Sequence, residues 1–170
     1  MEGAIPISMS EIQFTGYVPG VIGKITEAHG VYYHEHWGLD MSFESQVGRE
    51  LSEFLARFRQ GQDGLWVANV AGAFAGSVAI DGSDAGTQGA RLRWFIVTPA
   101  FQGSGIGKTL LGKSIRFCRE VGYTRVFLWT FEGLETARCL YESEGFRLSQ
   151  EHEVRQWGRE IKEQRFDLTL

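Results

Sequence analysis

Apolar side chains recur at helical spacing in several stretches of the chain. The clearest stripe predicts a helix over about residues 43–58, because the charged residues of this stretch fall on the rest of the helical wheel. Its apolar members are Phe43, Val47, Leu51, Phe54, Leu55 and Phe58. Shorter stripes predict helices over residues 19–29, 106–121 and 134–141. Gly122 and the sequence Glu-Gly-Phe at 144–146 end the last two of these helices.

Short runs rich in β-branched and aromatic residues lie between the helices and predict strands. They cover residues 12–16, 65–70, 74–80, 91–97, 124–130 and 166–170. The sequence Ala71-Gly72 joins the second and third runs as a hairpin. This order of elements predicts a mixed α/β fold, and it differs from the regular alternation of a doubly wound nucleotide-binding fold.

The chain length of 170 residues suits one domain with a core of its own. We expect a single domain over residues 1–170, in which residues 1–10 form a leader that can be disordered. The formal net charge of −4 gives no general attraction for nucleic acid, so unspecific DNA or RNA binding is not expected.

No apolar run approaches the roughly 20 residues of a membrane span, and no basic segment followed by an apolar one opens the sequence. The two cysteines, Cys118 and Cys139, lie in predicted helices without neighbours at metal-ligand spacing. We therefore expect no metal site, no membrane partner and a location in the cytoplasm.

The stretch FQGSGIGKTLL, residues 101–111, resembles phosphate-binding motifs of several kinds. A P-loop requires glycine where this chain has Gln102, and it also needs a second strand that ends in an acidic residue for Mg²⁺. A dinucleotide-binding fingerprint starts correctly at Gly103 and Gly105 but requires Gly or Ala in place of Lys108. Neither of these two motifs is complete.

The pattern that remains joins a strand end, Val97-Thr-Pro99, to Gln102-x-x-Gly105-x-Gly107 and an apolar helix. A second motif, A-x-x-L-Y-x-x-x-G-F, follows at residues 137–146. In this order and at this spacing the two motifs resemble the GNAT superfamily of N-acetyltransferases. The resemblance covers about residues 12–170 and implies an α/β fold of the GNAT (acyl-CoA N-acyltransferase) type, with a mixed central sheet flanked by helices.

The resemblance implies acetyl-CoA as cosubstrate, with its pyrophosphate on the glycine loop. Small residues at the start of a helix allow backbone N–H groups to approach a phosphate closely, and the helix dipole adds a favourable potential. The alternative is an ordinary glycine-rich turn. The resemblance also implies main-chain contacts from the strand of residues 91–97 to the pantetheine arm. The predicted cofactor-binding residues are Phe95, Val97, Gln102, Gly103, Ser104, Gly105, Ile106, Gly107 and Lys108.

The reaction implied by the family is direct attack of an amine on the thioester. Tyr141 matches the family tyrosine that commonly protonates the coenzyme A thiolate. Without the resemblance, its position on one helical face with Leu134 would indicate a core aromatic residue. Many relatives carry a cofactor-binding Asn where this chain has Leu134, so that contact is absent here or comes from a neighbour such as Thr130 or Glu132.

The proton acceptor is less clearly marked by the sequence. Many relatives use a glutamate on the strand that here reads Arg91-Leu-Arg-Trp-Phe, which has no carboxylate. The candidates come from the segment TEAHGVYYHEHWG and are Glu27, His29, His34, Glu35 and His36. We select His29 as a catalytic residue, because a histidine with a pKa near 6.5 suits a base at neutral pH. A histidine without a role in catalysis is the alternative.

The acceptor site is expected to combine aromatic side chains with a carboxylate for a cationic amine. The predicted substrate-binding residues are Glu27, Tyr33, Trp37, Trp94 and Trp129. At least half of the aromatic residues are expected to serve packing. No long acidic run is present, so we expect a small-molecule or amino-acid-like amine as acceptor rather than a histone tail.

The sequence thus predicts an acetyl-CoA-dependent N-acetyltransferase that acts on a primary amine. The alternatives are a GNAT fold kept as a ligand sensor or partner-binding domain, and a P-loop nucleotide hydrolase that binds Mg-ATP. The segment GKITEAHGVYYHEHWGLDMSFE also resembles the acetyltransferase domains joined to MarR-type winged-helix regulators. The family resemblance allows a homodimer, although no residue identifies an interface.

Overall fold

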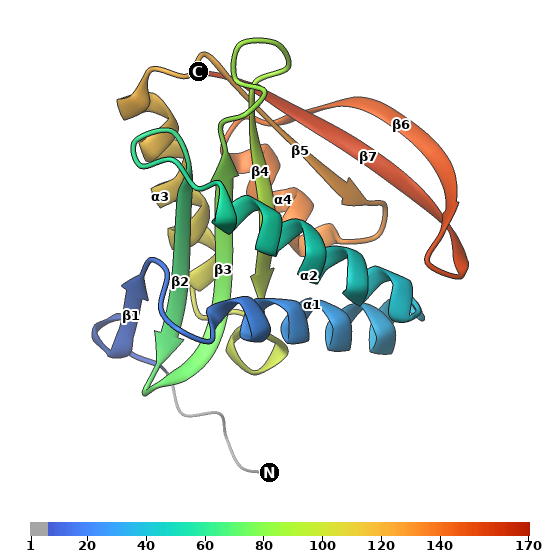
Figure 1. The fold of residues 1–170 in the computed structure, drawn as a ribbon, viewed down its shortest axis with the longest axis horizontal. Helices are drawn as coiled ribbons and strands as arrows, with labels where there is room; N and C mark the ends of the chain where they lie inside the picture. The colour runs from blue at the N-terminus through green and yellow to red at the C-terminus, as the bar shows by residue number, and fades with distance from the viewer. Residues whose placement is uncertain (1–6) are drawn as a thin grey trace.

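A twisted sheet forms the centre of the molecule, which was obtained as a computed structural model that describes residues 7–170. Seven strands lie in the order β1-β2-β3-β4-β5-β7-β6 (Figure 1). Their bounds are β1 (Ile12–Thr15), β2 (Gly64–Val70), β3 (Ala73–Asp81), β4 (Ala90–Val97), β5 (Arg125–Phe131), β6 (Arg147–Gln156) and β7 (Arg159–Thr169). Neighbouring strands are antiparallel except for β4 and β5, which run parallel.

Helices cover both faces of the sheet. In Figure 1, α1 (Val21–Trp37) and α2 (Met41–Ala56) lie in front of it, whereas α3 (Ile106–Val121) and α4 (Glu135–Ser143) lie behind it. Two short 3-10 helices, η1 (Met9–Glu11) and η2 (Pro99–Phe101), precede β1 and α3. None of the helices in the described part of the chain is long and apolar enough to span a membrane.

The two layers of helices enclose separate hydrophobic cores. The core behind the sheet joins α3 to the strands through fully buried residues such as Leu110 and Ile115, and it includes Tyr141. The core in front joins α1 and α2 to the sheet through Ile25 and Leu51. Each helix therefore buries one apolar face, as the hydrophobic stripes of the sequence predict.

Strands β4 and β5 pair over only a short length. Their register includes Ala90 with Val126 and Arg91 with Phe127, and no pairing follows along the rest of either strand. The main-chain groups on this side of β4 after Arg91 are consequently not used by β5. A gap between two neighbouring strands of one sheet offers hydrogen-bonding groups to a ligand.

A bulge in β4 lies opposite this gap. Trp94 has a φ of 46°, which is uncommon for a residue with a side chain, and the pairing with β3 shifts between Ser77 and Ala79. The buried hydroxyl of Ser77 donates to the carbonyl oxygen of Trp94 at 2.8 Å and satisfies this group. The bulge directs both Arg93 and Trp94 toward α2, where Glu50 binds Arg93 and Phe54 contacts Trp94.

Most predicted elements are confirmed, but the first helix is longer than expected. The helix continues through Gly30 and ends at Trp37, not at His29. A Cβ at Gly30 would lie 2.2 Å from Oε1 of Glu44, so this glycine permits the close approach of α2. The left-handed residue that ends α1 is Gly38, with a φ of 67°.

Strand β6 was not located by the sequence patterns. Its residues are exposed along nearly the whole length, so no alternation of apolar and polar positions marks it. It is held by continuous pairing with β7, with which it forms a long hairpin (Figure 1). Of the predicted leader, residues 1–6 lie outside the described residues, and Met9–Glu11 forms η1.

Candidate active site

A cavity of about 750 Å³ opens where β4 and β5 separate. Residues 91–97 of β4 and 128–131 of β5 line it, together with side chains from α1, α2, α4 and the hairpin of β6 and β7. The cavity therefore reaches both faces of the sheet through the gap between the strands. Cavities of this size accommodate small-molecule ligands.

The glycine loop lies at the start of α3, next to this cavity. Gly103 and Gly105 have φ values of 78° and 85°, a region that residues with side chains rarely adopt. The backbone N–H groups of residues 103–108 donate to no acceptor within residues 7–170, whereas the N–H of Thr109 donates to the carbonyl oxygen of Gly105. The loop thus presents a run of free donors at a helix N-terminus, which fits a pyrophosphate.

The side chains of the loop have different roles from its N–H groups. Gln102 lines the cavity, and its amide nitrogen donates to the carbonyl oxygen of Val97 at 3.1 Å. Ser104 donates to the carbonyl oxygen of Phe101. Ile106 is fully buried in the core, so only its main chain can face a ligand, and Lys108 is exposed at the helix start. These contacts hold the loop in shape and leave its N–H groups free.

Gly107 is required for packing and not for a left-handed conformation. A Cβ at this position would lie 3.2 Å from Cδ1 of Leu140 and 3.4 Å from Cγ2 of Val97. Both Phe95 and Val97 line the cavity and pack against the core behind the sheet. The start of α3 therefore lies close against β4 and α4, beside the main-chain groups of the unpaired part of β4.

Tyr141 reaches the cavity from α4. Its ring packs against Phe95 and Phe146 at centroid distances of 5.7 and 5.9 Å, and its hydroxyl makes no hydrogen bond within residues 7–170. Burial raises the pKa of Tyr141 well above its usual value, and Tyr33 adds to this effect. The side chain consequently remains a neutral phenol at physiological pH and can donate one hydrogen bond into the cavity.

His29 lines the cavity from α1 and is 5% exposed. Its Nδ1 lies 2.8 Å from the carbonyl oxygen of Ile25, so Nδ1 carries the proton and Nε2 is left with a lone pair. Burial lowers the pKa of His29 to about 4, against a smaller opposite effect of the Ile25 hydrogen bond. The prediction of a base with a pKa near 6.5 therefore has to be corrected: His29 is neutral, and it is a hydrogen-bond acceptor rather than a strong base.

The predicted aromatic residues of the acceptor site are brought together. Tyr33, Trp37, Trp94 and Trp129 all line the cavity. Phe43, Phe131 and Trp157 complete an aromatic wall, in which Tyr33 lies 5.0 Å from Phe43 and 5.6 Å from Phe131 between ring centroids. Trp129 lies two residues before Phe131 on β5, and its ring contacts the ring of His152.

The predicted acidic residue is not part of this arrangement. Glu27 is exposed on α1 and does not line the cavity, because the turn of the helix directs it away from the face that carries His29. His34 and Glu35 are also exposed and outside the cavity lining, whereas His36 is part of it. Within residues 7–170, no cluster of three or more histidine, cysteine or acidic residues is placed to hold a metal ion.

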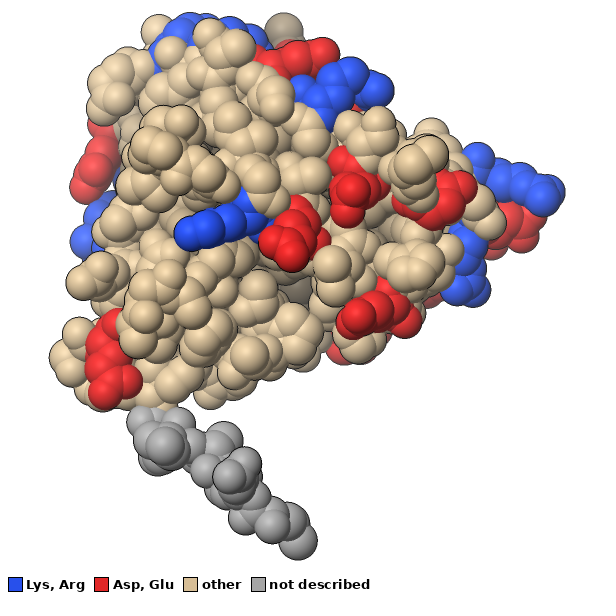
Figure 2. Space-filling view, turned by 60° about the horizontal axis from the view of Figure 1, so that its bottom comes forward, with Lys and Arg blue, Asp and Glu red and all other residues tan. Residues whose placement is uncertain are grey.

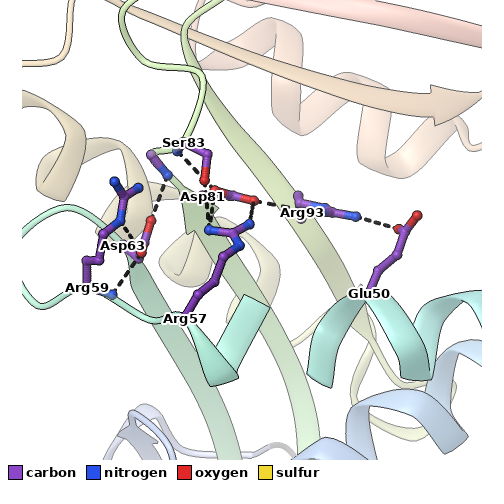
Figure 3. Close-up of polar contacts among 8 residues, drawn as sticks. Glu50, Arg57, Arg59, Asp63, Asp81, Ser83 and Arg93 are labelled. Carbon is purple, nitrogen blue, oxygen red and sulfur yellow. Dashed lines mark hydrogen bonds and ion pairs between the residues drawn. The ribbon is translucent and has the colours of Figure 1, made fainter. Parts of the chain in front are cut away.

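Charged residues form a connected network on the α2 side of the sheet (Figure 3). Arg57 binds Asp81 at 2.6 Å, and Arg93 lies between Asp81 at 3.5 Å and Glu50 at 2.5 Å. Burial alone would raise the pKa of Asp81, but hydrogen bonds from Arg57 and Ser83 lower it to about 2. Asp81 and Glu50 are therefore both paired with guanidinium groups.

Sequence reasoning missed the polar part of the cavity wall. Glu50, Arg91 and Arg93 line it from α2 and β4. Two arginines at alternate positions of one strand were the available signal, because alternate residues share a face. Figure 2 shows that acidic side chains outnumber basic ones around a hollow on the face that it presents, in keeping with the net charge of −4.

Comparisons with known proteins agree with this geometry. The model of the acetyltransferase (GNAT) family matches residues 24–146. No curated protein sequence matches the chain. The protein yncA of Salmonella typhimurium, assigned as an acetyltransferase and solved with acetyl-CoA, is 19% identical, with a TM-score of 0.75 over 94% of each chain.

Two further structures are similar over nearly their whole length. The ribosomal-protein-alanine N-acetyltransferase of Brucella melitensis is 16% identical, with a TM-score of 0.75 over 93% of this chain and 99% of that one. The spermidine N-acetyltransferase of Vibrio cholerae, in complex with CoA and spermine, is 17% identical, with a TM-score of 0.69 over 94% of this chain and 96% of that one. At these identities the likeness concerns the fold.

Proposed function

The chain belongs to the acetyltransferase (GNAT) family and is an acetyl-CoA-dependent acetyltransferase, and from this premise we propose that it acetylates the primary amine of a small-molecule or amino-acid-like acceptor. The fold predicted from the sequence motifs is confirmed as that of this family. The association with MarR-type regulators stays a prediction.

The observation that carries the proposal is the continuity of two features. The free N–H groups of residues 103–108 lie at one end of β4, and the cavity between β4 and β5 begins beside them. A ligand with a pyrophosphate at the loop can extend an amide-containing arm along the unpaired edge of β4. Acetyl-CoA has this form, and it supplies an acetyl thioester when bound.

In the proposed site, residues of this chain bind and orient both substrates. The main-chain groups of Phe95 and Val97 receive the pantetheine arm, and Gly103 and Gly105 allow the loop to approach the pyrophosphate. Lys108 adds a positive charge at the helix start. The polar contact that many relatives obtain from Asn is missing at Leu134. Of the two candidate replacements, Thr130 lines the cavity and Glu132 does not.

Tyr141 and His29 face the region where the amine meets the thioester. Burial raises the pKa of Tyr141, so its hydroxyl keeps its proton and would stabilise the departing sulfur by donating a hydrogen bond to it. The neutral Nε2 of His29 accepts a hydrogen bond from the attacking amine and helps to orient it. Amines with a pKa near 10 are mostly protonated at pH 7, so the site must select the neutral form.

The acceptor is proposed to lie on the aromatic wall formed by Tyr33, Trp37, Phe43, Phe131 and Trp157. Spermidine is the acceptor named for the Vibrio cholerae structure, which shares the fold, and it is a small molecule with primary amines. We also propose a cytoplasmic location, which the free thiols of Cys118 and Cys139 support.

The proposal is tested by titrating the purified chain with acetyl-CoA and separately with Mg-ATP, and then by following thiol release with a panel of amines. Acetyl-CoA binding followed by amine-dependent thiol release supports the proposed function. Binding without turnover of any amine would indicate a sensor domain. Binding of Mg-ATP alone would contradict the proposal.

A further inference from the structure

Arg91 stands apart from the other charged residues of the cavity. Its Nε is the single buried side-chain nitrogen or oxygen without a hydrogen-bond partner within residues 7–170. Its guanidinium forms no ion pair with any residue in this range. An arginine that is largely removed from water without a partner is costly, because its desolvation is not compensated.

The neighbouring carboxylates form ion pairs with other arginines and not with Arg91. Asp81, which faces Arg91 across the β3 and β4 pairing, binds Arg57 and Arg93. Glu50 binds Arg93 at 2.5 Å (Figure 3). Burial lowers the pKa of Arg91, and the positive charge of Arg93 lowers it further, whereas the smaller effects of Glu50, Asp81 and Asp84 only partly oppose this decrease. The local electrostatics therefore favour an additional anion beside Arg91.

A ligand in the cavity can supply this anion, since Arg91 is part of the cavity lining. The pyrophosphate of the cosubstrate is too far away. Its proposed cradle begins beyond Val97, and at about 3.3 Å per residue the two positions on β4 are roughly 20 Å apart. The Trp94 bulge lies between them, about 10 Å from Arg91 along the strand. An arginine side chain and a small acceptor molecule together can span the roughly 10 Å between Arg91 and the Trp94 bulge.

The remainder of the wall defines the rest of the acceptor. The aromatic residues Tyr33, Phe43, Phe131 and Trp157 pack against one another and line the same cavity as Arg91. Such a surface binds an apolar or aromatic group. His29 adds a neutral acceptor for an amine N–H.

We propose that Arg91 binds the carboxylate of the acceptor, and that the acceptor is an α-amino acid with an apolar or aromatic side chain. Arg91 is thus a specificity-determining residue, which distinguishes amino acids from amines that lack a carboxylate. This inference rests on the proposed function, because it names the acceptor of the same cavity.

The test uses matched pairs of substrates that differ only in the carboxylate: L-phenylalanine with phenylethylamine, and L-leucine with isoamylamine. The ratio of kcat/KM within each pair is measured for the wild type, for Arg91→Gln and for Arg116→Gln. Arg116 is an exposed residue of α3 and serves as the control for removal of a positive charge. Binding of each compound to the CoA-loaded chain is measured in parallel by tryptophan fluorescence, since several tryptophans line the cavity.

The wild type is expected to favour the amino acid by about 30-fold or more, the usual effect of a hydrogen-bonded charge pair. Arg91→Gln is expected to reduce this ratio to within about threefold and to leave the amine nearly unaffected, whereas Arg116→Gln retains the preference. A ratio near one in the wild type, or a ratio that survives in Arg91→Gln, overturns the proposal. Turnover of carboxylate-free amines alone would overturn it and leave the proposed function intact.

A measurement on the wild type covers the case in which Arg91→Gln does not fold. Phenylacetate and phenylacetamide are compared as competitors of the amine substrate. The carboxylate is expected to compete at a concentration at least about tenfold lower than the amide, because only the carboxylate pairs with a guanidinium. Equal competition by the two compounds contradicts the inference.

Discussion

The two ends of the cavity are built by different means. The proposed cofactor end consists of main-chain groups from one continuous stretch, Val97 to Lys108, in which glycines permit the conformation. The proposed acceptor end consists of side chains from α1, α2, β4, β5 and the β6–β7 hairpin. A backbone site is fixed by local geometry, whereas a side-chain site changes with each substitution on several elements. The first suits a cosubstrate common to a family and the second suits an acceptor that differs among its members.

The largest effect is expected from a substitution in the glycine loop, at the main-chain end of the cavity. Gly105→Val places a β-branched residue at a φ of 85° and adds bulk where the pyrophosphate is proposed to lie. We expect the affinity for acetyl-CoA to fall more than about 100-fold, because strain of about 1–3 kcal/mol adds to the lost contacts. Calorimetric titration measures the effect.

Gly112→Val is the matched control for this variant. Gly112 lies within α3, and a Cβ there would meet no atom within 4 Å. Its affinity for acetyl-CoA should equal that of the wild type. Normal binding by Gly105→Val would show that the loop does not need its left-handed conformation to hold the cosubstrate.

The second prediction concerns the point at which the two ends meet. Tyr141→Phe removes a hydroxyl that makes no hydrogen bond within residues 7–170, so the stability should change little. We expect kcat to fall by about 100-fold with nearly unchanged acetyl-CoA affinity, since only an interaction with the departing sulfur is lost. Steady-state kinetics and thermal unfolding are the measurements.

Tyr17→Phe provides the control, because Tyr17 is 58% exposed and outside the cavity lining. This variant should retain the activity of the wild type. An unchanged kcat in Tyr141→Phe would return Tyr141 to a purely structural role in the core behind the sheet.

The same contrast explains what the sequence could predict. The glycine loop and Tyr141 belong to motifs of fixed local spacing, and the predictions of their roles come from the family resemblance of these motifs. Arg91 and Trp157 are distant in sequence and line the same cavity only because β4 and β5 separate and the β6–β7 hairpin returns to the sheet. The spacing of residues along the chain does not predict which distant residues line one cavity.

Burial produces a second kind of error. Glu27 and His29 lie two positions apart on one helix, but only His29 is on the face that points to the cavity. The helix predicted over residues 19–29 contains both residues, but the sequence does not show which face of this helix meets the cavity. The pKa of His29 also depends on the side chains packed around it, which a sequence pattern does not show.

The third prediction uses this buried histidine to examine the acceptor end. The pKa of His29 is about 4 in the folded chain and near 6.5 when exposed. Between about pH 6.5 and 4, His29 binds a proton in the unfolded state but remains neutral in the folded state. The free energy of unfolding therefore falls as the pH drops through this range. His29 alone is expected to account for a loss of about 2 kcal/mol between pH 8 and pH 5.

The measurement is the free energy of unfolding by denaturant at several pH values. His29→Gln should have a smaller decrease below pH 6.5 than the wild type, whatever its stability at pH 8. His34→Gln is the control, because His34 lies on the same helix with an exposed side chain. If His29→Gln retains the full pH dependence, His29 does not have the lowered pKa that its burial implies.

The smallest effect is expected at Leu134. Here a side chain, rather than the main chain, lies at the proposed cofactor end of the cavity. Leu134 is the N-cap of α4, has no side-chain capping bond and lines the cavity. Leu134→Asn supplies a capping group worth about 0.5–1 kcal/mol and restores the amide that many relatives use toward the cosubstrate. We expect a slightly higher melting temperature and a two- to fivefold gain in acetyl-CoA affinity, of about the size of one neutral hydrogen bond. Leu134→Ala separates the two effects, because it removes the leucine without offering an amide and should give neither gain. A higher melting temperature without a gain in affinity would mean that Thr130 already makes this contact, and that a side chain from β5 completes an otherwise main-chain site.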